Sequence, residues 1–420
     1  MNNLYNDWLS VDVKSTDPLI DQYSQILDPN INGLVDICDL NNLYQSAIDV
    51  FDGLMWKPSH QYLLMSLLFT LREQAIKIYE KNYTPTFGDQ FTLSERGKTR
   101  YITPPTPINK VVAKAYHDYI LFPKTIPHLI YDNGASIKGR GISHARHRFN
   151  IHIQEAYKEY GKDTVILISD FSKYYDNIRH EILSNMYSDI LSPEQLEFLK
   201  VNLKSFEIDV SYMSEDEYSK ALDEVFNALE YHANIDKSKL TKEKFLAKSM
   251  AIGCQISQIA GVFYATPLDN YIKSVLGMKY YGRYNDDFYI IYNSREFLKD
   301  IFYNNILPLC QNMLGIYINP KKTHIDSVFH WNTYLKINYI MRFDGKLVMK
   351  PSSETIRREY RRIHKNYKGY MEGIFTLEEC INWYKSWRGT FNKFDCGYDI
   401  MKLDDEFRKT FHLPYQFKFN

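Results

Sequence analysis

The feature that most limits the fold of this chain is a pair of adjacent aspartates in an apolar, aromatic stretch. The run MKYYGRYNDDFYIIYN (278–293) predicts two strands joined by a turn at Asn285–Asp286. Neighbouring carboxylates repel each other, and apolar flanks raise that cost. Asn and Asp are also common in ordinary polar turns. The stretch therefore indicates either a solvated hairpin turn or a site where cations neutralise the pair.

A third carboxylate follows a second apolar run. TVILISD (164–170) is typical of a buried strand, and it ends at Asp170. If this strand joins the hairpin in one sheet, Asp170 lies beside Asp286 and Asp287. Carboxylate oxygens suit Mg²⁺, and such a cluster can hold two ions. In a two-metal site, one ion activates an attacking hydroxyl and the other stabilises a leaving pyrophosphate.

The charges are balanced in number but segregated along the chain. Lys plus Arg and Asp plus Glu each total 51. Residues 1–52 contain nine Asp and one Lys, residues 94–148 contain ten basic and three acidic residues, and residues 319–372 contain twelve basic and five acidic residues. Each basic block alone could be a solvated face, but blocks that flank a phosphate-handling site favour nucleic acid binding. We expect the acidic segment to pack away from a template, against a basic neighbour or another copy of the chain.

Length and cysteine content narrow the class of protein further. A chain of 420 residues predicts two or three subdomains. The five Cys are widely spaced without a CxxC pair, so we expect neither a zinc site nor a disulfide framework, and a reducing cytoplasm fits. We expect no signal peptide and no membrane partner, because the chain start lacks a basic and apolar leader pattern and no apolar run is long enough to span a bilayer.

Local patterns predict an alternation of helices and strands. QFTL and RYIT alternate like two strands around the turn at 95–98, and 333–350 alternates in the same way. The stretch 132–143 is a Gly- and Ser-rich loop. Helices are expected over most of 1–80, over 108–122 up to Pro123, over 144–160, over much of 178–250, over 257–276 with a disturbance at Pro267, over 297–314, and from 352 onward.

The order of these motifs resembles a reverse transcriptase over residues from about 83 to 400. The matching segments are TVILISDFSKYYDNI (164–178, motif A), AIGCQISQIAGVFYATPLDNYIK (251–273, motif B), RYNDDFYII (283–291, motif C), GIYINPKKTH (315–324, motif D), FTLSERGKTRYITPP (91–105, fingers hairpin) and NGASIKGRG (133–141, template side). This resemblance implies an α+β right-hand polymerase with an RRM-like antiparallel palm sheet. The implied parts are a helical N-terminal extension (1–82), fingers (83–163), palm (164–345) and a basic helical thumb (346–420).

The resemblance also implies roles at the acidic cluster and around the incoming nucleotide. The carboxylates named above and the Phe171 carbonyl would hold two Mg²⁺ ions, or Mn²⁺ in their place. Lys98 and Arg100 would grip the triphosphate, and their alternation on one strand points both to the same face, although a solvated edge is the plainer interpretation. Lys321 or Lys322 would lie near the incoming phosphates. Gln258 would contact the nucleotide or template, or simply cap its helix.

Tyr175 lies five residues after Asp170. In the family an aromatic residue at this offset lies under the sugar and excludes a 2′-hydroxyl, which implies a preference for dNTPs. The alternative is that Tyr175 is a core-facing aromatic side chain.

Further basic residues mark where nucleic acid would lie. Lys138 and Arg140 belong to the template-side motif. Arg357, Arg361, Lys365 and Lys368 share one face of an expected helix, at spacings of 4, 4 and 3. That face would follow a phosphate backbone, unless it is an ordinary solvated helix surface.

The resemblance implies an RNA-directed DNA polymerase that uses dNTPs and makes DNA. Retron signatures and appended endonuclease, zinc-finger or integrase-like segments are absent from the sequence, while KGRG and SQIAGVFYATPLDNYIK resemble the bacterial abortive-infection and unknown-group reverse transcriptases. That subgroup implies antiphage defence in the bacterial cytoplasm, with a non-coding RNA as template and scaffold. Template-independent or protein-primed synthesis is the alternative, a non-catalytic RNA-binding scaffold is a third, and a homo-oligomer is open.

Overall fold

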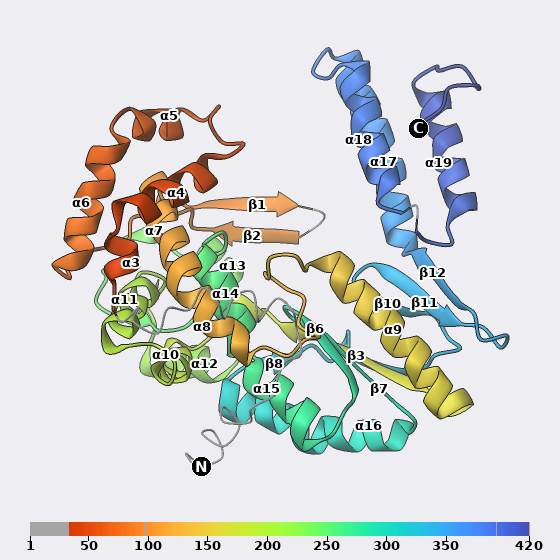
Figure 1. Cartoon of the computed structure of the whole chain (residues 1–420), viewed down its shortest axis with the longest axis horizontal. Helices are drawn as coiled ribbons and strands as arrows, with labels where there is room; N and C mark the ends of the chain where they lie inside the picture. Colours follow the sequence, from red (N-terminus) through yellow and green to blue (C-terminus); the bar gives the residue numbers. More distant parts are fainter. Residues whose placement is uncertain (1–32, 96–97, 392, 420) are drawn as a thin grey trace. The chain divides into compact units, whose positions relative to one another are not determined.

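The computed structural model describes residues 33–95, 98–391 and 393–419 (Figure 1). Contacts between Cα atoms divide the chain into two compact units. The first unit comprises Met1–Ala145, Ser169–Phe288 and Lys299–Thr323, and the second comprises Arg146–Ile168, Tyr289–Leu298 and His324–Asn420. None of the described helices combines the length and apolar character needed to cross a bilayer.

The first unit begins with helices, as the sequence predicts for this region. They are α3 (Val35–Cys38), α4 (Leu40–Phe51), α5 (Pro58–Met65) and α6 (Leu67–Tyr79). Asp39 caps α4 by accepting hydrogen bonds from the backbone N–H groups of Asn41 and Asn42 at 2.7 and 3.1 Å. Helix is confirmed for most of 33–80. The rest of that predicted region, and much of the acidic segment 1–52, lies outside the described residues.

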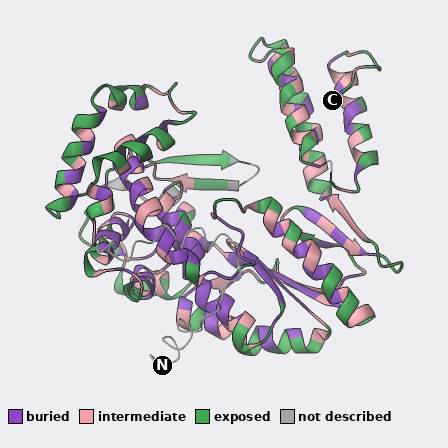
Figure 2. Ribbon diagram, in the orientation of Figure 1, coloured by how far each residue is buried: buried purple, intermediate pink, exposed green. Residues whose placement is uncertain are grey.

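A hairpin and a long helical run follow. Strands β1 (Phe91–Glu95) and β2 (Lys98–Ile102) pair antiparallel, which confirms the predicted strand pair, while turn residues 96 and 97 lie outside the described residues. Figure 2 shows much of this hairpin exposed. The helical run comprises α7 (Pro107–Tyr116), a π-helical turn (His117–Leu121) and α8 (Phe122–Thr125). The prediction that the helix over 108–122 ends at Pro123 was wrong. The helical run continues because Pro123 occupies an early position of α8, where no backbone N–H is needed.

A five-stranded sheet carries the acidic residues. Its strands are β3 (Val165–Ser172), β6 (Tyr280–Tyr284), β7 (Asp287–Tyr292), β8 (Tyr317–Ile318) and β9 (His324–Ser327). The order is β6-β7-β3-β8, and β9 also pairs with β3; both β8 and β9 run antiparallel to β3. The predicted hairpin at 278–293 is confirmed. The strand predicted to end at Asp170 continues to Ser172, because Ser172 pairs with Tyr317.

Buried helices of the first unit lie in the motif B region. These are α14 (Gln255–Tyr264), α15 (Thr266–Asn270) and a π-helical turn (Tyr271–Val275). The predicted disturbance at Pro267 is confirmed, since α14 ends at Tyr264 and Pro267 is the second residue of the next helix, α15. Most of α14 is buried (Figure 2).

The region between motifs A and B contains a small additional core. Helices α10 (His180–Ser188) and α11 (Pro193–Lys204) come first. Residues 208–246, here called the insert, contain β4 (Ile208–Asp209), α12 (Glu215–Asp223), α13 (Ala228–Asn234) and β5 (Phe245–Leu246). Its core is built from Ile208, Val210, Phe226, Ala228, Tyr231 and Leu246.

The second unit contains most of α9 (Ile142–Tyr160) and a three-stranded antiparallel sheet. The strands are β10 (Asn332–Tyr334), β11 (Ile337–Met341) and β12 (Leu347–Pro351), as the alternation predicted. The ring of Phe149 in α9 lies 4.5 to 4.7 Å, centroid to centroid, from the rings of Tyr289, Tyr334 and Tyr339. Helix α16 (Arg295–Ile301) is followed by π-helical turns Phe302–Ile306 and Leu309–Leu314, which confirms helix for 297–314.

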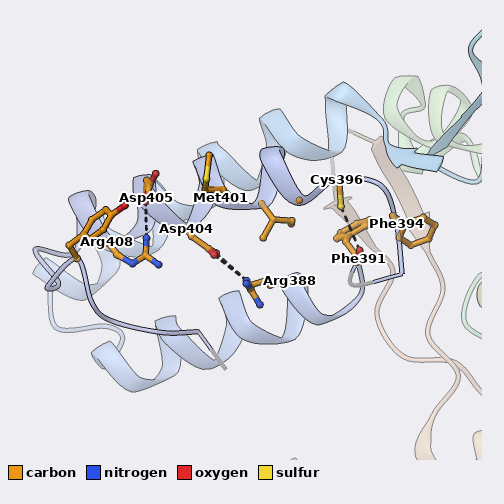
Figure 3. A pocket seen from close by; sticks show the side chains of 11 residues that line it. Arg388, Phe391, Phe394, Cys396, Met401, Asp404, Asp405 and Arg408 are labelled. Carbon is orange, nitrogen blue, oxygen red and sulfur yellow. Dashed lines mark hydrogen bonds and ion pairs between the residues drawn. The ribbon is translucent and has the colours of Figure 1, made fainter. Parts of the chain in front are cut away.

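The second unit ends in a three-helix bundle, as predicted for the tail. It consists of α17 (Ser353–Met371), α18 (Leu377–Gly389) and α19 (Gly397–Thr410) around Ile363, Cys380, Tyr384, Leu403 and Phe407. A cavity of about 380 Å³ lies between α18 and α19 (Figure 3). Charged side chains that line the cavity form ion pairs with each other: Arg388 pairs with Asp404 at 3.2 Å, and Arg408 pairs with Asp405 at 2.7 Å.

Candidate active site

The two acidic segments are joined by their backbones. The N–H of Phe171 in β3 donates a hydrogen bond to the carbonyl of Asp286 at 3.0 Å. The Phe171 ring lies 5.5 Å from that of Phe288, just past the turn. The sequence prediction that Asp170 and the Asn285–Asp286 turn meet in one sheet is therefore confirmed at the level of the backbone.

The Asp170 carboxylate is buried and already faces a positive charge. Asp170 is 3% exposed, and Lys322 Nζ forms an ion pair with its Oδ2. Its Oδ1 is buried without a hydrogen-bond partner among the described residues. A buried carboxylate is costly unless it is paired, so the site favours a cation at Asp170. The structure brings Lys322, rather than Lys321, to this carboxylate.

The oxygen atoms near Asp170 are of the type that divalent metal ions bind. Asp286 and Asp287, both half-buried, follow Asn285, whose φ of 54° forms the tight turn. Oxygen donors are the ligands that Mg²⁺ takes, and the unpartnered Oδ1 of Asp170 offers one. Within the described ranges, no three His, Cys, Asp or Glu side chains gather into a ready metal-holding group.

Tyr175 packs against motif B. A Cβ atom built on Gly261 of α14 would lie 2.7 Å from Cε1 of the Tyr175 ring, so the ring lies directly against that glycine. Burial raises the pKa of Tyr175 to about 12, and the nearby negative charge of Asp286 adds to the increase.

Arg283 and Asp269 form a buried ion pair that the sequence patterns did not single out. Both side chains are fully buried, and Arg283 Nη2 lies 2.7 Å from Asp269 Oδ2. Arg283 Nη1 also donates a hydrogen bond to the Asn285 carbonyl at 2.9 Å. The available signal was an arginine inside the otherwise apolar strand YYGRY, since a buried charge requires a partner.

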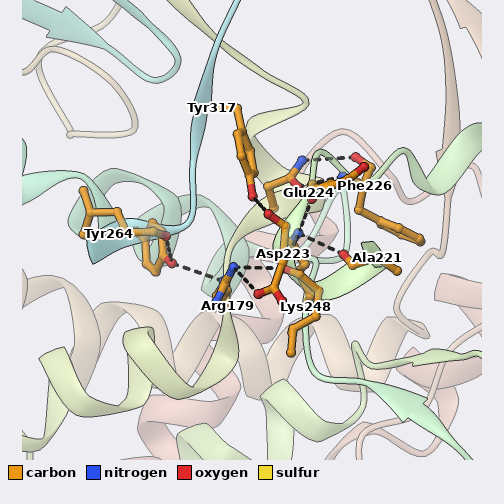
Figure 4. A network of polar contacts seen from close by, with 11 residues as sticks. Arg179, Ala221, Asp223, Glu224, Phe226, Lys248, Tyr264 and Tyr317 are labelled. Atoms are coloured by element: carbon orange, nitrogen blue, oxygen red, sulfur yellow. Dashed lines mark hydrogen bonds and ion pairs between the residues drawn. The ribbon is translucent and has the colours of Figure 1, made fainter. Parts of the chain in front are cut away.

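The segment after Tyr175 is fastened to the insert (Figure 4). Lys248 Nζ donates to the carbonyls of Ala221, Leu222 and Glu224 at 3.1, 3.1 and 2.8 Å. Burial lowers the pKa of Lys248 to about 8, and the positive charge of Arg179 adds to the decrease. Arg179 Nη2 itself donates to the Leu222 carbonyl at 2.9 Å. The Arg179 bond connects the insert to the residue that follows motif A, and the Lys248 bonds hold the insert to the segment that follows it.

Among the other predicted nucleotide-binding residues, Arg100, Gln258 and Lys321 have exposed side chains. Arg100 is exposed on β2, where it pairs in register with Leu93, and Lys98 starts the same strand. Gln258 is exposed on α14, within the helix and four residues after its N-cap residue Cys254. Lys321 is exposed, and its N–H donates to Asn319 Oδ1 at 3.1 Å.

The predicted template-side residues differ from each other in environment. Lys138 is exposed, whereas Arg140 Nη1 donates to the carbonyls of Tyr131 and Asn133 at 2.9 and 3.1 Å. The guanidinium of Arg140 also lies 5.1 Å from the centre of the Tyr131 ring, so Arg140 contributes to the shape of its own loop. In the second unit, the four basic residues predicted to follow a phosphate backbone are all exposed on α17: Arg357, Arg361, Lys365 and Lys368.

Comparison with known protein families agrees with this geometry. The family described as reverse transcriptase (RNA-dependent DNA polymerase) matches residues 88–357, more than half of the chain. No match was found among curated proteins. The family implies a right-hand polymerase fold, and the mixture of helices and sheet is consistent with it. Its members generally use divalent metal ions. The chain belongs to the reverse transcriptase family and is an RNA-directed DNA polymerase, a nucleotidyltransferase that takes dNTPs and a nucleic acid template.

Proposed function

We propose that this polymerase transfers deoxynucleotides at a two-metal site formed by Asp170, Asp286 and Asp287. The observation that carries the proposal is the hydrogen bond from the Phe171 N–H to the Asp286 carbonyl at 3.0 Å, which aligns the two acidic segments. The cation at the buried Asp170 carboxylate supports it, because Lys322 supplies there the charge that a metal ion would supply.

Each residue has a separate task in this proposal. The three carboxylates and the Phe171 carbonyl would hold two Mg²⁺ ions, or Mn²⁺. When bound, the ions lower the pKa of the primer 3′-hydroxyl and stabilise the pyrophosphate that leaves. Lys98, Arg100 and Lys321 bind the triphosphate oxygens as cations, and Gln258 contacts the nucleotide or template.

Tyr175 and Lys322 complete the proposed site. The Tyr175 ring lies under the sugar of the incoming nucleotide and excludes a 2′-hydroxyl. Lys322 neutralises Asp170, and with metal ions held by the carboxylates its ammonium would be available to bind a phosphate oxygen.

We also propose a path for nucleic acid and the corresponding parts of the hand. Residues 83–163 serve as fingers, 164–345 as palm and 346–420 as thumb, after an N-terminal extension over 1–82. Lys138 and Arg140 would face the template, and Arg357, Arg361, Lys365 and Lys368 would follow a phosphate backbone. The exposure of these four α17 side chains supports the last assignment.

For the biological role, we propose antiphage defence in the bacterial cytoplasm, with an associated non-coding RNA copied into DNA. Support comes from the sequence alone, through the likeness of KGRG (138–141) and SQIAGVFYATPLDNYIK (257–273) to the abortive-infection and unknown-group reverse transcriptases. Template-independent or protein-primed synthesis would use the same acidic site and differ only in template and primer.

The double variant Asp286→Ala, Asp287→Ala tests the catalytic proposal. We expect loss of dNTP incorporation and of phage protection, with unchanged folding and RNA binding. Asp344→Ala is the matched control, because Asp344 is an exposed aspartate in the turn between β11 and β12. Incorporation by the double variant at the level of the control would refute the metal assignment.

Sequencing the nucleic acids that copurify with the protein, with and without phage infection, tests the biological proposal. One defined RNA with complementary DNA would support templated copying. Homopolymer DNA would overturn it in favour of template-independent synthesis. DNA that resists RNase and is released by protease would overturn RNA priming in favour of a protein hydroxyl.

A further inference from the structure

We propose that Arg283 and Asp269 are positioning residues that hold the Asn285–Asp286 turn in the geometry required for catalysis. The predicted effect on catalysis rests on the function proposed for Asp286 and Asp287. The predicted effect on the turn itself does not, because it follows from the contacts of Arg283 alone.

The guanidinium of Arg283 binds the Asp269 carboxylate through two parallel contacts. Nε lies 2.8 Å from Oδ1, and Nη2 lies 2.7 Å from Oδ2. Both side chains are fully buried, so water cannot replace either partner. Tyr281 Oη donates a further hydrogen bond to Asp269 Oδ1 at 2.5 Å. This two-point geometry fixes the plane of the guanidinium relative to α15.

The remaining donors of the same guanidinium reach the catalytic turn and motif B. Nη1 donates to the Asn285 carbonyl at 2.9 Å, and Nη2 donates to the Val262 carbonyl at 2.8 Å. Asn285 has a φ of 54° and directly precedes Asp286, so its carbonyl sets the direction in which the turn leaves the strand. Val262 follows Gly261, the residue against which Tyr175 packs. Arg283 thus connects the acidic turn to the wall of the nucleotide site.

The backbone of Arg283 makes a third connection, to the loop before Lys138. The Arg283 N–H donates to the Asp132 carbonyl at 3.1 Å, and the Gly134 N–H donates to the Arg283 carbonyl at 3.3 Å. Asp132 is held in turn by Lys273 of motif B, whose Nζ lies 2.9 Å from its Oδ2. One residue therefore bonds to the turn, to motif B and to this loop.

Arginine is the side chain that satisfies all of these acceptors together. Its planar group offers five donors in a fixed fork, whereas a lysine ammonium is a single point charge. Arg283→Lys therefore keeps the charge that Asp269 needs but cannot span Asp269, Val262 and Asn285 at once. Because a displacement of about 1 Å in a reacting group can reduce the rate about 100-fold, a loosened turn should affect the chemical step first.

The test measures Arg283→Lys in the full-length protein. We expect kcat for dNTP incorporation to fall about 10- to 100-fold, while KM for dNTP and Kd for primer–template change less than about threefold. In protein without metal or nucleic acid, we expect faster amide hydrogen exchange in a peptide spanning the turn. Arg295→Lys is the matched control, because Arg295 pairs with Asp326 at 3.2 Å on a partly exposed surface and should leave both measurements unchanged.

Unchanged kcat and unchanged exchange in folded Arg283→Lys would overturn the proposal, as would a loss of activity that only matches the unfolded fraction. If Arg283→Lys does not fold, Tyr281→Phe removes one hydrogen bond to Asp269 and keeps the ion pair. A kcat reduction of a few fold in Tyr281→Phe would then support the proposal, and an unchanged kcat would overturn it. Failure of the proposed function is distinguishable, because it would appear as activity of the Asp286→Ala, Asp287→Ala variant, whereas hydrogen exchange at the turn tests Arg283 independently.

Discussion

Gly261 sets the position of the Tyr175 ring. An alanine methyl at this position would lie 2.7 and 3.0 Å from two ring carbons of Tyr175 and 3.0 Å from its hydroxyl oxygen, which is too close for an undisturbed contact. The carbonyl of the same glycine accepts a hydrogen bond from Tyr174 Oη at 2.6 Å. The glycine thus allows Tyr174 and Tyr175 of motif A to pack against α14. Its function is to provide space, which neither residue type nor spacing reveals.

Tyr175→Ala should admit ribonucleotides. Removing the ring opens the space proposed for the 2′-hydroxyl, so we expect the preference for dNTP over rNTP to fall about tenfold or more, equivalent to about 1.4 kcal/mol. The measurement is kcat/KM for matched dNTP and rNTP pairs. Discrimination equal to that of the unaltered protein would contradict the sugar contact.

Substitution of Gly261 by alanine should also change the preference for dNTP over rNTP. Gly261→Ala displaces the Tyr175 ring, so we expect a smaller change in dNTP over rNTP preference, together with lower kcat/KM for dNTP. Gly389→Ala is the matched control, because a methyl group there meets nothing within 4 Å. Equal behaviour of the two alanine variants would show that the ring position does not set discrimination.

Among the elements, α17 has a charged side chain on its buried face. Glu359 is 4% exposed and packs in the bundle formed with α18 and α19. Burial raises the pKa of Glu359 to about 7, and Arg362, at 3.9 Å, opposes the increase only in part. A carboxyl whose pKa is higher in the folded state binds more protons folded than unfolded between its two pKa values. The bundle should therefore lose stability as the pH rises from about 4.5 towards 7.

Glu359→Gln tests this pH dependence. Glutamine resembles the protonated carboxyl, so we expect little change in the free energy of unfolding at pH 5 and a clear stabilisation at pH 8. Denaturant unfolding followed by the fluorescence of Trp383 and Trp387 in α18 reports on this bundle. Glu354→Gln, at an exposed position one turn earlier, is the control and should show no such dependence. Equal stabilisation at both pH values would contradict the proposed cause.

The elements that the sequence predicted correctly carry local signals. The hairpin at 278–293 has a turn residue that tolerates positive φ between β-rich runs, and Pro267 interrupts helix because it lacks an N–H. The errors have a physical reason. Strand β3 runs past Asp170 because Ser172 finds a partner in Tyr317, and such a distant pairing leaves no local pattern. The small sheet of the insert depends likewise on pairing Ile208 with Leu246.

At the scale of the whole molecule, the sequence predicts the residues proposed to bind metal and nucleotide. It predicts less well the residues that hold them in place. The acidic residues and Tyr175 stand in recognisable motifs at fixed offsets. Lys322 reaches Asp170 from 152 positions away, and motif order left it equivalent to Lys321. Arg283 stands out in the sequence as an arginine in an apolar strand, but its partner Asp269 and its bond to the Asn285 carbonyl are identified only by the three-dimensional contacts. Sequence motifs identify the residues that contact substrate more clearly than the residues that position them.

The zero net charge of the whole molecule hides an uneven distribution that should appear in salt dependence. Each phosphate contact made by a cation releases counterions, so the slope of log K against log salt concentration falls by about 0.7 to 0.9 for each contact removed. Arg361 and Lys365 lie four residues apart and exposed on α17. We therefore expect Arg361→Gln, Lys365→Gln to reduce the slope for primer–template binding by about twice that amount, with unchanged thermal stability.

The matched control for this prediction is Lys402→Gln, Lys409→Gln, which removes two exposed lysines from α19 of the same bundle. The measurement is fluorescence anisotropy of a labelled primer–template at several salt concentrations. If the α17 face follows the phosphate backbone, only the α17 pair changes the slope, because the total charge removed is the same in both variants. Equal changes in both would mean that the charge acts at long range on the whole complex, and that α17 makes no direct phosphate contact.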